Sequence, residues 1–157
     1  MQYTLADMIQ VFRNSRTLTL LLLIALTPIS ACTLTTQRSA PTLYEELGGA
    51  AGVDTLTTDF IRKIAADERI KGRYRDSDIG RFHRMMGEQM CLLTGGGCTY
   101  TGDDMLRTHA GMKITRVEFT AIVEALMLAM DKNNIPQGTQ NRLLELYAPM
   151  HNDIVDR

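Results

Sequence analysis

The segment of residues 93–112 reads LTGGGCTYTGDDMLRTHAGM, and its run of glycines followed by a loop and a histidine decides the fold. The glycines at 95–97 end an apolar stretch of helical spacing, because glycine readily adopts the positive φ with which many helices stop. A polar loop follows, and a short segment then carries His109. Taken alone, one histidine in a polar segment is more often a surface residue than a metal ligand, so the surrounding sequence has to decide its role.

On both sides of this segment, apolar residues recur every three or four positions, which is the spacing of amphipathic helices. Val53, Leu56 and Phe60 show this spacing before the segment. No stretch alternates with a period of two between turn residues, so the sequence predicts an all-α fold. The predicted helices cover about residues 43–47, 52–66, 79–93, 115–133 and 137–154. An irregular connection is expected over 67–78, a short segment with His109 over 103–111, and an interruption near Pro149.

Two Thr-x-x-Glu pairs mark the starts of predicted helices. Thr42 stands three residues before Glu45, and Thr115 stands three residues before Glu118. In such a pair the threonine and glutamate side chains each accept a hydrogen bond from the other residue's backbone N–H, which closes the first helical turn. The two pairs therefore fix where the first helix of the domain and the long helix over 115–133 begin.

Four motifs stand in a fixed order along this predicted domain. They are LYEELGG at 43–49, LTGG at 93–96 with YTG at 100–102, MLRTHAGM at 105–112, and Phe119, Leu126, Ile135-Pro136 and Ala148-Pro149-Met150 in the last two helices. In this order they resemble the group 1 truncated globins, and the match covers residues 42–155. The resemblance implies a two-over-two helical sandwich around a haem.

The resemblance also implies that His109 is the proximal iron ligand, and imidazole suits this role in globins. The other ring nitrogen then needs an acceptor, for which we expect a backbone carbonyl. The cofactor would be haem b without a covalent link, because the chain has no Cys-x-x-Cys-His motif. The residues that the resemblance places around the haem, besides His109, are Ile61, Tyr74, Phe82, Met85, Met86 and Met112.

On the distal side of the haem, opposite His109, the residues differ from those typical of the family. Ile61 stands where many members carry tyrosine, and Phe82 and Met86 stand where glutamine is frequent. The distal side therefore lacks a hydroxyl or amide that donates a hydrogen bond to O₂, which is worth about 1 kcal/mol or more in a dry site. We predict weaker O₂ retention and easier autoxidation than in relatives that have these donors.

Two residues leave the coordination of the distal side open. Met86 is either a sixth ligand through its thioether or part of the core, where methionine is usually found. His83 either swings toward the iron or a haem propionate, or it remains a solvated helix residue. The candidates to pair with the propionates are Arg81, Arg84, Arg107 and Lys113, each of which is otherwise a surface charge.

The beginning of the chain resembles an export signal. Basic residues precede a short apolar run, and Ile29-Ser30-Ala31-Cys32 resembles the lipobox of bacterial lipoproteins. The alternative is an ordinary signal peptide or membrane anchor that happens to hold a cysteine. The predicted division is a signal peptide over 1–31, a tether over 32–41 acylated at Cys32, and a globin domain over 42–157. The lipid would hold the protein on the periplasmic side of a bacterial membrane, with the outer membrane favoured.

Two cysteines remain in the predicted domain, Cys91 and Cys98. The periplasm is oxidising, so an even pair of cysteines there often forms a disulfide. The alternative is a buried Cys91 and a free Cys98. The sequence leaves this choice open.

The overall charge narrows the classes of function. The formal net charge is −1, and charges of both signs are scattered along the chain, which excludes nucleic acid as a partner. The leading hypothesis is a haem protein that binds a diatomic gas (O₂, NO or CO), as in oxygen transport, or that passes electrons to a partner. The alternatives are a redox enzyme, such as a nitric oxide dioxygenase or a peroxidase, and a haem-free structural lipoprotein. Whether the protein is an enzyme stays open.

Overall fold

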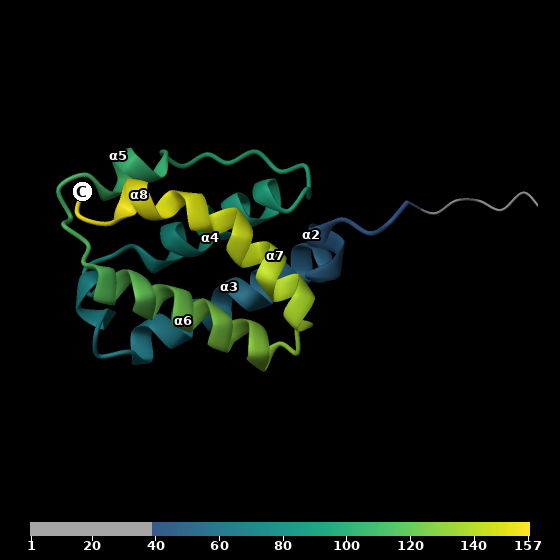
Figure 1. Cartoon of the computed structure of the whole chain (residues 1–157), viewed down its shortest axis with the longest axis horizontal. Helices are drawn as coiled ribbons and strands as arrows, with labels where there is room; N and C mark the ends of the chain where they lie inside the picture. Colours follow the sequence, from purple (N-terminus) through teal and green to yellow (C-terminus); the bar gives the residue numbers. More distant parts are fainter. Residues whose placement is uncertain (1–38) are drawn as a thin grey trace, which may run out of the picture. The chain divides into compact units, whose positions relative to one another are not determined.

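Helices make up most of the described part of the chain, residues 39–157 of a computed structural model, and no strand occurs within it. The all-α prediction is confirmed. The predicted signal peptide and Cys32 lie outside the described residues, as does the tether up to residue 38. In chain order the elements are α2 (Leu43–Glu46), α3 (Gly49–Ala66), the 3₁₀ turn η1 (Lys71–Tyr74), α4 (Ile79–Leu93), α5 (Met105–His109), α6 (Arg116–Lys132), α7 (Gln137–Tyr147), the 3₁₀ turn η2 (Ala148–Met150) and α8 (His151–Ile154) (Figure 1).

The starts of α2 and α6 follow from their first residues. Both predicted capping boxes are present, with Thr42 paired to Glu45 and Thr115 paired to Glu118. Each threonine side chain accepts the backbone N–H of its glutamate, and each glutamate accepts the N–H of its threonine. These bonds satisfy donors that the first helical turn cannot pair internally.

α3 begins three residues earlier than the sequence predicted. Gly48, with φ at 92°, occupies the position before the helix, and α3 starts at Gly49. Gly52, which we expected to start the helix, lies inside it, and a Cβ atom there would lie 1.8 Å from the carbonyl oxygen of Leu47. The glycine is needed for this close approach of α2 to α3, and it does not mark a helix end.

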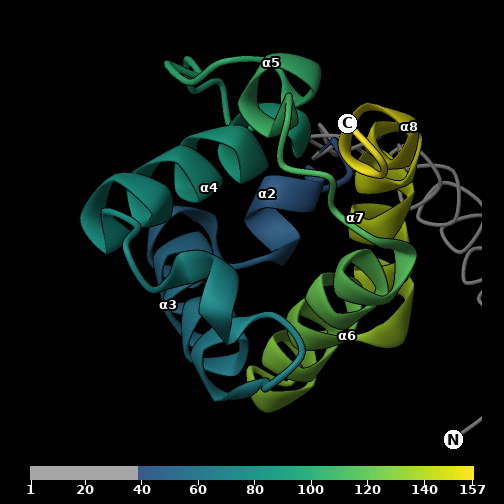
Figure 2. The ribbon, with the colours of Figure 1, turned by 90° about the vertical axis from the view of Figure 1, so that its left-hand side faces the viewer.

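Two pairs of helices form the layers of the fold. Figure 2 shows α3 and α4 on one side and α6 and α7 on the other. α3 packs against both α4 and α6, so it joins the two pairs. This arrangement confirms the two-over-two sandwich. The fully buried side chains include Leu56, Ile64, Met90, Met130 and Leu143. No helix within residues 39–157 is both long enough and apolar enough to span a bilayer.

The segment after α5 is attached to the C-terminal end of the chain. Gly111 and Lys113 both have positive φ and turn the backbone there. The N–H of Lys113 donates to the carbonyl oxygen of Arg157, and the N–H of Asp156 donates to that of Ile114. As a result, the short helix α5 lies beside α8 (Figure 1).

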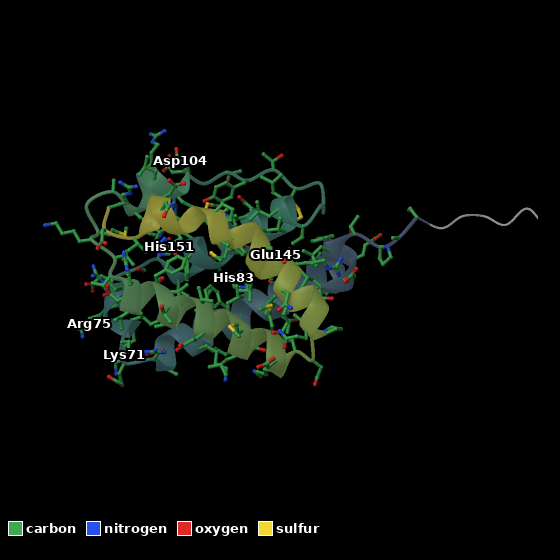
Figure 3. The ribbon with its side chains drawn as sticks, in the orientation of Figure 1. Lys71, Arg75, His83, Asp104, Glu145 and His151 are labelled. Carbon is green, nitrogen blue, oxygen red and sulfur yellow. A yellow bond between two sulfur atoms is a disulfide. The ribbon has the colours of Figure 1, made fainter. Side chains whose placement is uncertain are left out.

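A disulfide joins Cys91, near the end of α4, to Cys98 in the following loop (Figure 3). Of the two alternatives for these cysteines, the structure has the bonded one. The cross-link restricts the unfolded chain, which stabilises the fold by about 2–3 kcal/mol in the chain-entropy model. Gly96 lies within this loop, and a Cβ atom there would approach the Cys91 sulfur to 2.5 Å and the ring of Tyr44 to 2.8 Å. The loop therefore requires a residue without a side chain.

Candidate functional site

A cavity of about 1110 Å³ is lined by residues of both helix pairs. Its volume lies slightly above the usual range for small-molecule sites, about 300–1,000 Å³, so it admits a large ligand. Apolar side chains dominate the lining, among them Phe60 from α3, Ile122 from α6 and Leu144 from α7. A large, mostly apolar ligand fits this lining.

Six of the seven residues predicted to contact the cofactor line this cavity. They are Tyr74, Phe82, Met85, Met86, His109 and Met112. Ile61 is the exception, because it lines a neighbouring cavity of about 260 Å³. Tyr74 and Phe82 line both cavities, so they separate the position of Ile61 from the larger space.

His109 is the residue in the cavity wall best arranged to bind a metal ion. Its Nδ1 lies 2.8 Å from the carbonyl oxygen of Met105, one helical turn earlier in α5. In the tautomer with the proton on Nδ1, this nitrogen donates to the carbonyl, and Nε2 keeps a free lone pair. The backbone acceptor is the one that the sequence analysis expected. It orients the ring and leaves one nitrogen for coordination.

Aromatic and thioether side chains are prominent in the wall contributed by η1 and α4. The rings of Tyr74 and Phe82 are 5.1 Å apart between centroids and tilted by 38°. Burial raises the pKa of Tyr74 to about 12, so its hydroxyl keeps its proton at neutral pH. Met85 and Met86 follow along α4. The polar groups that these two elements bring to the cavity are Tyr74, Arg73, Arg81 and Gln89.

His83 contacts α3 and is not among the residues that line the large cavity. Its Nε2 lies 3.1 Å from the Thr58 hydroxyl and 3.6 Å from a carboxylate oxygen of Asp54. Of the four basic residues proposed to pair with propionates, Arg81 and Arg107 line the cavity, whereas Arg84 and Lys113 are not in its lining.

The structure also brings residues to the cavity that the sequence analysis did not single out. Figure 3 marks one of them, His151 on α8, whose ring lies edge-on to that of Phe119 with centroids 4.8 Å apart. The others of chemical interest are Arg73, Gln89, Tyr100 and Tyr147. No local pattern identifies these residues, because they reach the cavity from elements far apart in the sequence.

The polar members of this group differ in how they are satisfied. The Tyr100 hydroxyl donates to the carbonyl oxygen of Asp103 at 3.0 Å. The Gln89 amide reaches only the sulfur of Met105, at 3.7 Å. The Tyr147 hydroxyl is buried without any hydrogen-bond partner, and burial raises its pKa. An orphaned donor in a cavity wall fits a space that a bound group completes.

A model of the bacterial-like globin family matches residues 42–156, nearly all of the described chain. In sequence, the chain is 26% identical over 116 residues to the group 1 truncated hemoglobin of Tetrahymena pyriformis. That alignment covers 74% of this chain and 96% of the relative.

Solved structures show the same fold. The truncated hemoglobin of Tetrahymena pyriformis in its Fe(III) form superimposes with a TM-score of 0.72 at 26% identity. The 2/2 hemoglobin of Synechococcus sp. PCC 7002, solved in the cyanomet state with covalently attached heme, gives 0.70 at 29% identity. Each match covers 74% of this chain and 100% of the other.

Proposed function

The chain belongs to the bacterial-like globin family, whose members bind diatomic gases at haem iron, and we propose that it does so with His109 as the proximal ligand. Haem b is the standard cofactor of globins, and when bound it supplies the iron to which the gas coordinates. The observation that carries the assignment is the hydrogen bond from His109 to the Met105 carbonyl within the wall of the large cavity.

The residues of the cavity fit haem in size, polarity and charge. The volume of about 1110 Å³ and the apolar lining suit the porphyrin ring. Arg81 and Arg107 are exposed at the cavity and suit the carboxylates of the propionates. Met86 lines the cavity from α4 and packs against the core, so it can contact the ring without serving as a ligand.

We propose that the gas site is predominantly apolar. Phe82, Met85 and Met86 line the cavity from α4, and none of them carries a hydrogen-bond donor. A hydrogen bond favours O₂, which becomes polar on iron, much more than CO. The protein is therefore expected to retain O₂ more weakly than relatives that have distal donors, and to bind CO and NO without this disadvantage.

The test is an absorption spectrum of residues 33–157 reconstituted with haem, beside the His109→Ala variant. This part is suitable, because relatives that match it over nearly their full length fold as whole chains. We expect an intense Soret band in the parent that is lost or shifted in His109→Ala. The matched control is His151→Ala, which removes the other histidine of the cavity wall and should keep the ferric band.

Two results would contradict the proposal. An unchanged spectrum for His109→Ala, or an equal change in both variants, removes the proximal assignment. A parent that takes up no haem removes haem-based gas binding altogether and favours the structural lipoprotein.

We also propose that the globin is exported and anchored by a lipid on Cys32. The lipobox-like tetrad carries this proposal, and the disulfide between Cys91 and Cys98 supports an oxidising location such as the periplasm. Metabolic labelling with a radioactive fatty acid should label the parent and leave Cys32→Ser unlabelled. Equal labelling of the two proteins, or none in the parent, would exclude the anchor.

A further inference from the structure

One arginine joins the two sides of the fold at the cavity. Arg73 lies in η1, between α3 and α4, and Glu118 lies in the first turn of α6. The Nε of Arg73 donates to Oε1 of Glu118 at 2.7 Å, and Nη2 donates to Oε2 at 3.0 Å. A guanidinium that pairs with a carboxylate through two parallel bonds fixes orientation as well as distance.

The remaining nitrogen of Arg73 reaches the segment that follows the proposed iron ligand. Its Nη1 donates to the carbonyl oxygen of Met112 at 2.8 Å. The N–H of Met112 in turn donates to the carbonyl oxygen of His109 at 3.0 Å. Arg73 therefore acts on the backbone of His109 through a single intervening residue.

Arg73 and Glu118 are themselves held in place by other contacts. Arg73 follows Ile70, which is only 1% exposed, and its N–H donates to the Ile70 carbonyl at 2.9 Å. At the other end, Oε2 of Glu118 also accepts the N–H and the hydroxyl of Thr115, each at 2.8 Å. The Arg73 guanidinium, and then these bonds, lower the pKa of Glu118 to about 2, so its carboxylate is charged at neutral pH.

The segment around His109 has few other contacts that hold it. α5 has five residues, and none of them is buried. Apart from the bonds of Arg73, the segment is held by the packing of α5 against α8 and by its attachment to the C-terminal residues 155–157. A histidine on such a short, exposed helix depends on contacts made by its neighbours for a defined orientation.

We propose that Arg73 is a positioning residue for the haem, holding the 110–115 segment so that His109 meets the iron in one orientation and the cofactor is retained. This inference rests on the proposed function, because it concerns the same site. Its test is distinct, since it compares variants of a protein that already binds haem.

The variant is Arg73→Gln, and the chain offers a matched control in Arg69→Gln. Arg69 also reaches α6, with Nη2 donating to Oε2 of Glu124 at 2.6 Å. The two arginine side chains are similarly exposed, 40% for Arg73 and 43% for Arg69. Arg69 neither lines the cavity nor bonds the segment after His109. Comparing the two variants therefore separates the loss of an ion pair with α6 from the loss of the hydrogen bond to the segment after His109.

Two readouts are needed on the haem-loaded protein. The first is the iron–histidine stretching band in the resonance Raman spectrum of the ferrous form, which reports the orientation of the histidine. The second is the rate of haem transfer to a scavenging apoglobin. We expect Arg73→Gln to shift the band and to release haem roughly tenfold faster, as loss of a charge-assisted hydrogen bond would produce. Arg69→Gln should match the parent in both readouts.

Further variants guard against a failure to fold. Arg73→Lys keeps the positive charge but loses the paired N–H groups of the guanidinium, and Glu118→Gln keeps the shape of the side chain but loses its charge. Both should change the two readouts in the same direction as Arg73→Gln, but by a smaller amount. The proposal is overturned if Arg73→Gln keeps the parental band and release rate, or if Arg69→Gln alters them equally. Absence of haem from the parent would instead refute the proposed function.

Discussion

At the scale of single residues, Tyr100 and Tyr147 border the same cavity but differ in the hydrogen bonding of their hydroxyl groups. The hydroxyl of Tyr100 donates to the Asp103 carbonyl, whereas that of Tyr147 is buried and unpaired. Burial raises the pKa of both phenols, so both are neutral donors. An unpaired buried hydroxyl costs about 1–3 kcal/mol, so we expect Tyr147 to destabilise the protein without cofactor.

We expect Tyr147→Phe to raise the free energy of unfolding of the haem-free protein by about 1 kcal/mol, because it removes the unpaired group and keeps the ring. Tyr100→Phe is the control, and it should lower that free energy by about 1 kcal/mol through loss of a formed hydrogen bond. Urea denaturation measures both. Equal destabilisation by the two substitutions would mean that the Tyr147 hydroxyl has a partner in solution.

A donor introduced at Phe82 should reverse the predicted weakness toward O₂. Phe82→Gln places an amide in the cavity wall, and one hydrogen bond of about 1 kcal/mol slows O₂ dissociation roughly fivefold. Phe82→Leu changes the size of the side chain without adding a donor. Stopped-flow displacement of O₂ by CO measures the two rates. If glutamine and leucine give the same rate, the effect is steric and the proposed lack of a donor has no functional consequence.

At the scale of elements, the first turn of α6 depends on a charged Glu118. The Arg73 guanidinium, and then the N–H of Thr115, hold the pKa of Glu118 at about 2, below its ordinary value of 4.5. A carboxyl group whose pKa is lower in the folded chain contributes stability above its ordinary pKa. That contribution is lost as the pH falls from about 5 toward 2.

Glu118→Gln should therefore remove part of the acid sensitivity of the protein. We expect the parent to be more stable than the variant at pH 7 by roughly 1–3 kcal/mol, with the two curves converging near pH 2. Urea denaturation at a series of pH values measures this difference. Parallel curves over the whole range would show that Glu118 is not paired in the folded chain.

The disulfide between α4 and its following loop gives a second prediction at this scale. Reduction with dithiothreitol should lower the free energy of unfolding by about 2–3 kcal/mol, because the unfolded chain gains freedom when the cross-link opens. The double variant Cys91→Ala with Cys98→Ser should have this lower stability already and should not respond to the reductant. A response of equal size in the double variant would place the effect elsewhere.

At the scale of the whole molecule, the sequence predicted those parts that neighbouring residues determine. The capping pairs and the glycine runs act within about four positions, so they placed most helix ends within a few residues of those observed. The contact of His109 with the Met105 carbonyl is also local, one helical turn away. The predicted start of α3 at Gly52 was wrong because this glycine serves a contact between two helices, which the local sequence does not reveal.

The rest of the site depends on contacts between distant parts of the chain. Arg73 and Glu118 are 45 positions apart, and Arg73 looks like an ordinary charge in an irregular stretch. Tyr147 and His151 reach the cavity because α7 and α8 pass beside it. The distal position illustrates the same limit, since Phe60 lines the large cavity while Ile61, about 100° further around α3, lines its neighbour.

The shortness of α5 has a consequence for how the cofactor is exchanged. α3, α4, α6 and α7 supply most of the buried core, and α5 supplies none of it. We therefore expect the segment that carries His109 to detach and reattach at lower cost than the other helices, because little apolar surface is exposed when it does so. A chain that is already folded should then take up or release haem through this local opening, without passing through its denatured state.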